Sequence, residues 1–196
     1  SDDPTFNGTP GGSSSSEYWG FDGGDVFTYD TTNETWMTNM AEDGAQFTII
    51  MWVYTGGAGN NAFAGTGASS GTSWNFHEDG GGKINWVVRN SGTSVLEIKR
   101  GDALATGAWK MVSVRMVEAT PVADIGIDTD YTNFTSGYSS PPSGAHATSM
   151  KFSDFGGGDL FKSGGRIAAV FMWEGSALST ANITTIFNAT KTRFGL

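Results

Sequence analysis

Apolar and polar residues alternate along much of the chain, in short runs that glycine clusters separate. In segment 109–117, Val112, Val114 and Met116 share one face of an extended strand, and Ser113 lies on the other. The same alternation marks segments 74–77, 83–89, 95–100 and 124–129. The pattern predicts short strands that pack one face on a core and turn the other toward solvent or a partner.

Two segments, 47–54 and 166–173, are apolar on both faces. Runs of this kind, rich in β-branched and aromatic residues, are typical of strands that are buried in the middle of a sheet. The chain closes on segment 191–196, which we expect to form a short terminal strand.

A short helix is predicted between these last two strands. Ser179 is placed to cap it, and Leu178 can pack against Ile183 as a hydrophobic staple. Ile183, Ile186 and Phe187 fall at helical spacing, and the pattern stops after about two turns.

The composition indicates one all-β domain. Glycine accounts for 29 of the 196 residues, and little in the sequence favours long helices. A sandwich of this length usually forms a single domain. We expect residues 1–16, rich in Gly, Ser and Pro, to form a flexible N-terminal arm, and residues 17–196 to form the domain. The arm either contacts a neighbouring chain in an assembly or packs along its own sandwich.

Four motifs resemble those of laminin-G-like (concanavalin A-like) domains. The strand motif G-x-I-x-x-V-x-x-[WY] begins at Gly165, and the helix motif L-S-x-x-x-I-x-x-[IF]-[YF]-N begins at Leu178. The opening F-D-G-x-D-x-[VF]-x-[VIY] begins at Phe21, and F-T-[IV]-x-x-W-V begins at Phe47. The resemblance implies an antiparallel, two-sheet jelly-roll sandwich with one short helix near the C-terminus. The ending 188–196 also resembles the close of such domains in tailed-phage structural proteins.

Charge and cysteine content narrow the possible partners. A net charge of −9 argues against nucleic acid or an anionic membrane as a partner, because both require a basic surface. No stretch approaches the roughly 20 apolar residues of a membrane span. The absence of cysteine excludes disulfides and thiolate zinc sites, and it favours a bacterial or viral source. The start at Ser1 shows no signal peptide, so one was either removed or never present.

The sequence offers little support for a catalytic function. The related β-glucanases carry their two acids as E-x-D-x-x-E on one strand, and this motif is absent here. Asp124, Asp128 and Asp130 come nearest, and a solvated strand face explains them better. His77 and His146 are the two histidines, and no nucleophile motif surrounds a serine. We therefore predict that the protein is not an enzyme.

A calcium ion is the next candidate ligand, because relatives of this fold often hold one at the rim of the sandwich. Asp22 and Asp25 lie in a glycine-rich turn, and Asp154 and Asp159 flank Gly156–Gly158. Either pair could supply hard oxygen ligands. Solvated turn residues are the competing explanation, since no dense calcium motif is present.

Glycan binding requires an aromatic platform beside amide and charged hydrogen-bonding groups. The candidates lie on two neighbouring predicted strands and in a long loop: Trp74, Phe76, His77, Asn85, Arg89 and Tyr138. Five of the seven tryptophans are expected in the core: Trp36, Trp52, Trp86, Trp109 and Trp173. Trp19 and Trp74 could be either buried or exposed.

Two functional classes remain open. The first is a non-catalytic structural or adhesive protein at a virion surface, a capsid-decoration or tail-associated component. Such a protein would form a homo-oligomer in an assembly, contact other virion proteins and bind cell-surface glycans. The second is a carbohydrate-binding module of a secreted bacterial enzyme or adhesin. A glycanase ranks third.

Overall fold

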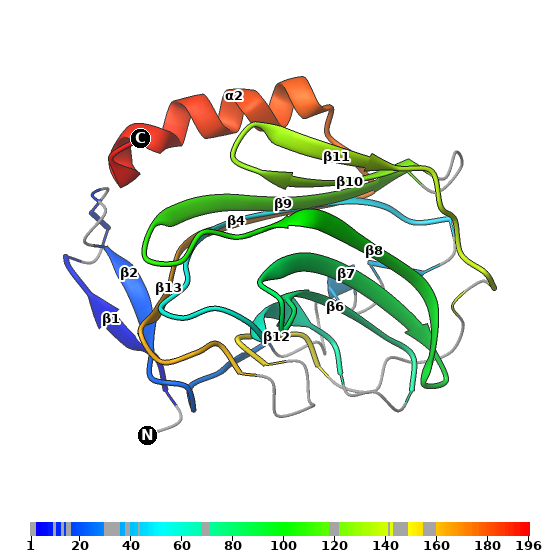
Figure 1. Ribbon diagram of the computed structural model, residues 1–196, viewed down its shortest axis with the longest axis horizontal. Coiled ribbons are helices and arrows are strands. Elements are labelled where there is room, and N and C mark those ends of the chain that lie inside the picture. The colour runs from blue at the N-terminus through cyan, green and yellow to red at the C-terminus, as the bar shows by residue number, and fades with distance from the viewer. Residues whose placement is uncertain are drawn as a thin grey trace.

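The computed structural model describes the chain as two antiparallel sheets packed face to face (Figure 1). The described residues are 3–9, 11, 12, 14, 17–29, 36, 37, 40–42, 44–67, 71–117, 122–140, 142, 149–154 and 160–196. Within them, no helix is both long and apolar enough to span a bilayer.

One sheet contains seven strands among the described residues. In spatial order these are β1 (Thr5–Asn7), β2 (Tyr18–Phe21), β13 (Gly165–Glu174), β4 (Gln46–Tyr54), β9 (Trp109–Val117), β10 (Val122–Ile127) and β11 (Asp130–Phe134). The other sheet contains six: β3 (Phe27–Thr28), β12 (Lys151–Phe152), β5 (Asn61–Gly65), β6 (Ser73–Glu78), β7 (Lys83–Asn90) and β8 (Thr93–Ala103). Every described pair is antiparallel, which confirms the predicted all-β jelly-roll sandwich.

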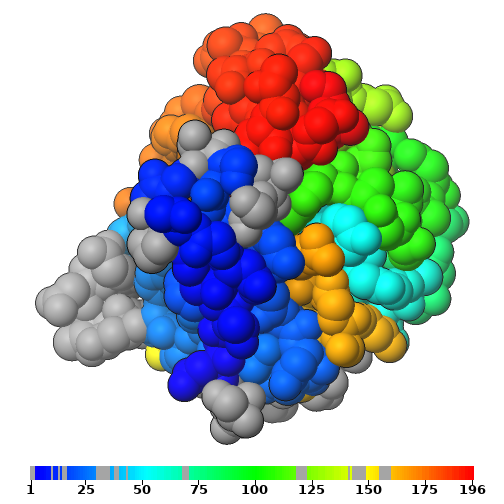
Figure 2. Space-filling view, turned by 90° about the vertical axis from the view of Figure 1, so that its left-hand side faces the viewer, coloured from blue at the N-terminus to red at the C-terminus, as the bar shows by residue number. Residues whose placement is uncertain are grey.

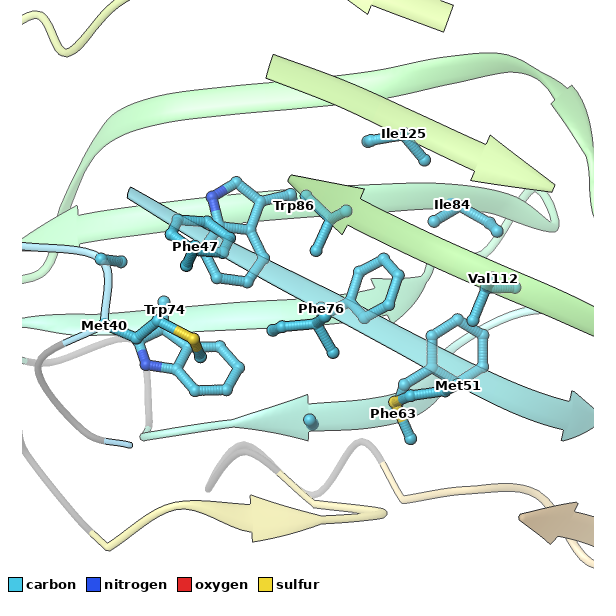
Figure 3. Packing of buried hydrophobic residues seen from close by; sticks show 14 of the residues in the cluster. Met40, Phe47, Met51, Phe63, Trp74, Phe76, Ile84, Trp86, Val112 and Ile125 are labelled. Carbon is cyan, nitrogen blue, oxygen red and sulfur yellow. The ribbon is translucent and has the colours of Figure 1, made fainter. Parts of the chain in front are cut away.

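Aromatic rings fill the space between the sheets (Figure 3). Trp74 stacks on Trp86 with ring centroids 5.2 Å apart, and Phe47 of the facing sheet lies 4.9 Å from Trp86. Trp52, Trp86 and Trp109 are buried as predicted, whereas Trp36 and Trp173 are only partly buried. Strand β13 is also more exposed than expected, because β2 pairs with it only at residues 165–167.

Helix α2 (Thr180–Thr190) covers the outer face of the seven-stranded sheet (Figure 1). Its cap is as predicted, with the Ser179 hydroxyl accepting from the Asn182 amide at 3.1 Å. Ile183 and Phe187 of α2 pack on Trp52 and its neighbours, so the helix buries the apolar outer face of β4 and β9.

The predicted terminal strand is wrong. Residues Lys191–Phe194 form a 3₁₀ helix, η1, which ends at Gly195 with a positive φ of 77°. The helical turn brings Phe194 back over the sheet, where it stacks on Trp52 at 4.1 Å between ring centroids. An extended chain would carry this ring past the tryptophan.

Part of the N-terminal arm packs along its own sandwich. Strand β1 pairs with β2, with Phe6 opposite Trp19. Arg193 then donates from Nε to the Ser14 carbonyl at 2.9 Å and from Nη2 to the Glu17 carbonyl at 2.7 Å. Figure 2 shows the result: the blue N-terminal segment runs down the face of the molecule, and its upper end lies against the red C-terminal segment.

Candidate functional site

The seven-stranded sheet is incomplete beside β13. Strand β2 pairs with β13 only from Gly165 to Ile167, whereas β4 follows β13 as far as Glu174. The register of the β4 ladder shifts around Ala168, which marks a bulge. Beyond Ile167, this edge of β13 is therefore not bonded to any described strand.

A pocket of about 450 Å³ opens at this place. Four separate parts of the chain line it: Trp19, Phe27, Thr28, Tyr29, Phe152, Ile167, Ala168, Ala169 and Val170. We call it the aromatic pocket. None of the described side chains that line it carries a charge at neutral pH, so this part of the pocket suits an uncharged ligand.

Two exposed rings form its walls. Trp19 is 39% exposed, and its ring is held edge-to-face by Phe6 at 5.1 Å and by Phe27 at 5.0 Å. Tyr29 is 41% exposed and rests against Phe152 at 5.5 Å. Among the described residues, three large apolar side chains are exposed, and two of them lie in this pocket. Such a concentration marks a contact surface.

The aromatic pocket also offers hydrogen-bonding groups. The Thr28 side chain is exposed, and its hydroxyl can donate and accept. The main chain of Ala168–Val170 forms the strand edge that β2 leaves uncovered. Flat apolar walls with a few polar groups are what a sugar ring needs, since its faces carry C–H groups and its rim carries hydroxyls.

The predicted glycan platform of Trp74 and Phe76 is contradicted by the structure. Both side chains are fully buried between the sheets (Figure 3). Strand alternation explains the result, because Trp74 and Phe76 point to one face of β6 while His77 points to the other. The aromatic and polar halves of that predicted site therefore lie on opposite sides of the sheet.

The polar candidates do lie together on the outer face of the six-stranded sheet. His77 pairs in register with Asn85, and the Asn85 amide donates to Glu97 Oε1 at 3.1 Å. Arg89 Nη1 lies 2.6 Å from the Asn75 side-chain oxygen when that amide is turned to satisfy both of its neighbours. Asn85 is only 4% exposed. Asn85 and Arg89 thus each bond to a neighbouring side chain of the same sheet.

Tyr138 takes a structural position instead. Its hydroxyl donates to the Ala41 carbonyl at 2.8 Å, and its ring packs against the core. Neighbouring Pro141 and His146 lie outside the described residues.

The calcium candidates are only partly brought together. The Asp22 amide donates to Asp25 Oδ2 at 2.8 Å, so both belong to one turn. Ser153 donates to the Asp25 carbonyl, which places Asp154 near that turn, but Asp154 is paired with Lys151 at 3.0 Å. Asp159 lies outside the described residues. Among the residues that are described, no three acidic or histidine side chains form a metal cluster, and a calcium site stays a prediction.

The acids nearest to a catalytic pattern all have cationic partners. Asp124 is bound by Arg115, Asp128 by Lys110 at 2.6 Å, and Asp130 by Arg100 at 2.8 Å. Carboxylates that are engaged in ion pairs suit a structural role better than that of a general acid.

Neither protein-family models nor curated protein sequences match this chain. Among solved structures, the chain is similar to the CBM40 module of a Ruminococcus gnavus sialidase bound to α2,3-sialyllactose. The TM-score is 0.67 at 11% identity, with 87% of this chain and 96% of that chain covered.

Two further structures show the same likeness. Domain 4 of AbnA, an extracellular arabinanase from Geobacillus stearothermophilus solved with arabinotriose, gives a TM-score of 0.63 at 16% identity, covering 93% of this chain and 80% of that chain. NanB sialidase from Streptococcus pneumoniae gives 0.66 at 11% identity, over 86% of this chain but only 27% of the sialidase. The chain thus has the jelly-roll sandwich fold that is also found in carbohydrate-binding modules.

Proposed function

We propose that this chain is a carbohydrate-binding module that holds neutral sugar residues in the aromatic pocket. The observation that carries the proposal is the pair of exposed rings, Trp19 and Tyr29, on the walls of an uncharged pocket. A sugar ring stacked on Trp19 would bury C–H groups against the indole while its hydroxyls reach Thr28 and the open edge of β13.

The structural neighbours support a binding role. Two of them were solved with oligosaccharides, and the arabinanase to which one belongs is extracellular. We therefore propose that this chain acts outside the cell, and that it binds glycans rather than hydrolysing them. The role at a virion surface, with its virion partners and homo-oligomer, stays a prediction on which the fold comparison has no bearing.

A glycan array followed by calorimetry with arabinotriose and lactose tests the proposal. Trp19→Ala and Tyr29→Ala should each weaken binding by about tenfold or more, because each removes one wall of the pocket. Trp173→Ala is the matched control, a partly exposed indole on β13 that does not line the pocket. It should leave the affinity within about twofold.

Thermal unfolding of every variant confirms that the sandwich is intact. The proposal fails if the folded wild-type protein binds no neutral glycan. It also fails if Trp173→Ala weakens binding as much as Trp19→Ala does.

A further inference from the structure

Arg166 lies on the other side of the β2–β13 ladder from the aromatic pocket. Successive strand residues point to opposite faces, so Ile167 lines the aromatic pocket while Arg166 points away from it. On that side, a second pocket of about 370 Å³ opens between the β1–β2 hairpin and the start of β13. Its polar lining includes Asp3, Thr5, Asn7, Asp22, Asp25 and Arg166.

Two tyrosines fix the Arg166 guanidinium. Its central carbon lies 4.6 Å from the ring centroid of Tyr18 on β2 and 4.4 Å from that of Tyr54 on β4. Since β13 runs between β2 and β4, the rings flank the guanidinium from both neighbouring strands. Each contact is a cation–π interaction, which uses the flat faces of the guanidinium and leaves its N–H edges free to bond.

No described residue accepts a hydrogen bond from those edges. The guanidinium forms no hydrogen bond or ion pair with any of the residues that the structure describes. An arginine held by stacking, with its donors directed into a pocket, is preorganised for a planar acceptor. A carboxylate matches that fork with two parallel hydrogen bonds.

The acidic side chains of the second pocket restrict the remainder of the ligand. Asp22 Oδ1 accepts from the Gly24 amide at 2.9 Å, and Asp25 Oδ2 accepts from the Asp22 amide at 2.8 Å. Each carboxylate keeps a further oxygen that can accept a hydrogen bond. Together with the net charge of −9, these acids disfavour a multiply charged anion such as phosphate. Asp3 lines the same pocket, so three carboxylates face the one guanidinium. They restrict the ligand to a single carboxylate, which must lie on Arg166, and they favour hydroxyl donors for the rest of it.

We infer that the second pocket binds a sugar acid, with its single carboxylate on Arg166 and its hydroxyls donating to Asp22 and Asp25. Thr5 and Asn7 of β1 border the same space. The site is separate from the aromatic pocket, and it stands or falls independently of the proposed binding of neutral sugars.

NMR titration of the full chain tests the inference, with the Arg Nε–Hε signals as readout. Sodium glucuronate should shift the Arg166 signal, whereas glucose, which lacks the carboxylate, should not. Arg166→Gln should weaken glucuronate binding by about tenfold or more. Arg166→Lys keeps the charge but loses the planar fork, and it should weaken binding almost as much.

Lys162→Gln is the matched control, because it removes an equal charge from an exposed position just before the same strand. It should keep the wild-type affinity within about twofold. Trp19→Ala should also keep it, which separates this site from the aromatic pocket. A neutral oligosaccharide that carries one terminal glucuronate, titrated beside glucuronate, separates a polysaccharide end from a free sugar acid, and binding of either one supports the inference.

Three results would overturn it: glucose shifting the Arg166 signal as strongly as glucuronate, wild-type affinity in Arg166→Gln, or full affinity in Arg166→Lys. Unfolding curves of the variants show whether a loss of binding reflects a loss of fold.

Discussion

Arg100 and Arg166 place the same side chain in opposite situations. Arg100 is 2% exposed, and all of its nitrogens donate: to both Asp102 carboxylate oxygens, to the Asp130 carboxylate and carbonyl, and to the Ile125 carbonyl. This ties β8 of one sheet to the β10–β11 hairpin of the other. Arg166 is stacked between rings and donates to no described residue.

The difference separates two regions of the molecule. Around Arg100, polar groups are used up internally, so the region holds the sheets together. Around Arg166 and Trp19, rings and donors are held in place while one side of each stays open. Binding sites have this second character, because a preorganised group with unused bonding capacity gives affinity without an ordering cost. Substitutions in the two regions should therefore affect different quantities.

The largest stability difference is expected between two tryptophans. Trp74→Ala should lower the free energy of unfolding by about 3 to 5 kcal/mol, because it empties a fully buried site stacked on Trp86. Trp19→Ala should cost about 1 kcal/mol, since that ring is already partly in water. Chemical denaturation measures both. Equal costs would show that Trp19 is part of the core rather than a binding wall.

The arginine pair comes next. Arg100→Ala should cost about 2 to 3 kcal/mol, because it removes a buried guanidinium that donates to the Ile125 and Asp130 carbonyls and to two carboxylates. Arg166→Ala should cost about 1 kcal/mol or less, the value of its ring contacts. A larger loss for Arg166→Ala would mean that Arg166 holds the sheet together and is not kept for a ligand.

Much of this fold could be predicted from the sequence, because its strands carry a local signal. The apolar runs of β4 and β13 and the capped helix α2 each depend on neighbouring residues. The 3₁₀ turn of η1 could not be foreseen, since a distant ring, Trp52, fixes Phe194.

The two pockets could not be predicted from the sequence for the same reason. Trp19, Tyr29 and Phe152 come from distant segments, and only the order of strands in space joins them. Strand alternation within 74–77 is enough to place Trp74 and His77 on opposite faces of the sheet. It would not have shown which face was inside.

Glu78 is buried at the end of β6, and its carboxyl gives a pH test of a region in which polar groups bond internally, as they do around Arg100. Burial raises the pKa of its carboxyl above 4.5, although hydrogen bonds from Asn61 and Gly59 act in the opposite direction. The folded protein therefore binds the Glu78 proton more readily than the unfolded chain does. This contribution to stability falls as pH rises from about 4.5 to the raised pKa, and it is constant above that pKa.

Glu78→Gln should flatten the fall across that window in denaturation measured at a series of pH values. Glu174→Gln, at an exposed position, is the matched control and should leave the pH dependence unchanged. If the free energy of unfolding of Glu78→Gln kept the wild-type pH dependence, this carboxyl would be solvated. The ends of β5 and β6 would then resemble the region around Arg166 and Trp19 rather than the one around Arg100.

The smallest expected effect on stability concerns the contact between the two ends of the chain, close to Trp19 and the second pocket. Arg193→Ala removes the donors to the Ser14 and Glu17 carbonyls, so β1 and the start of β2 lose an anchor. Both carbonyls can bond to water instead, and we expect a loss of about 1 kcal/mol or less. Hydrogen exchange should quicken in β1 and stay slow in β7. Because Thr5 and Asn7 border the second pocket, the same variant should weaken glucuronate binding modestly. Faster exchange throughout the sandwich would instead place Arg193 with Arg100, among the residues that hold the two sheets together.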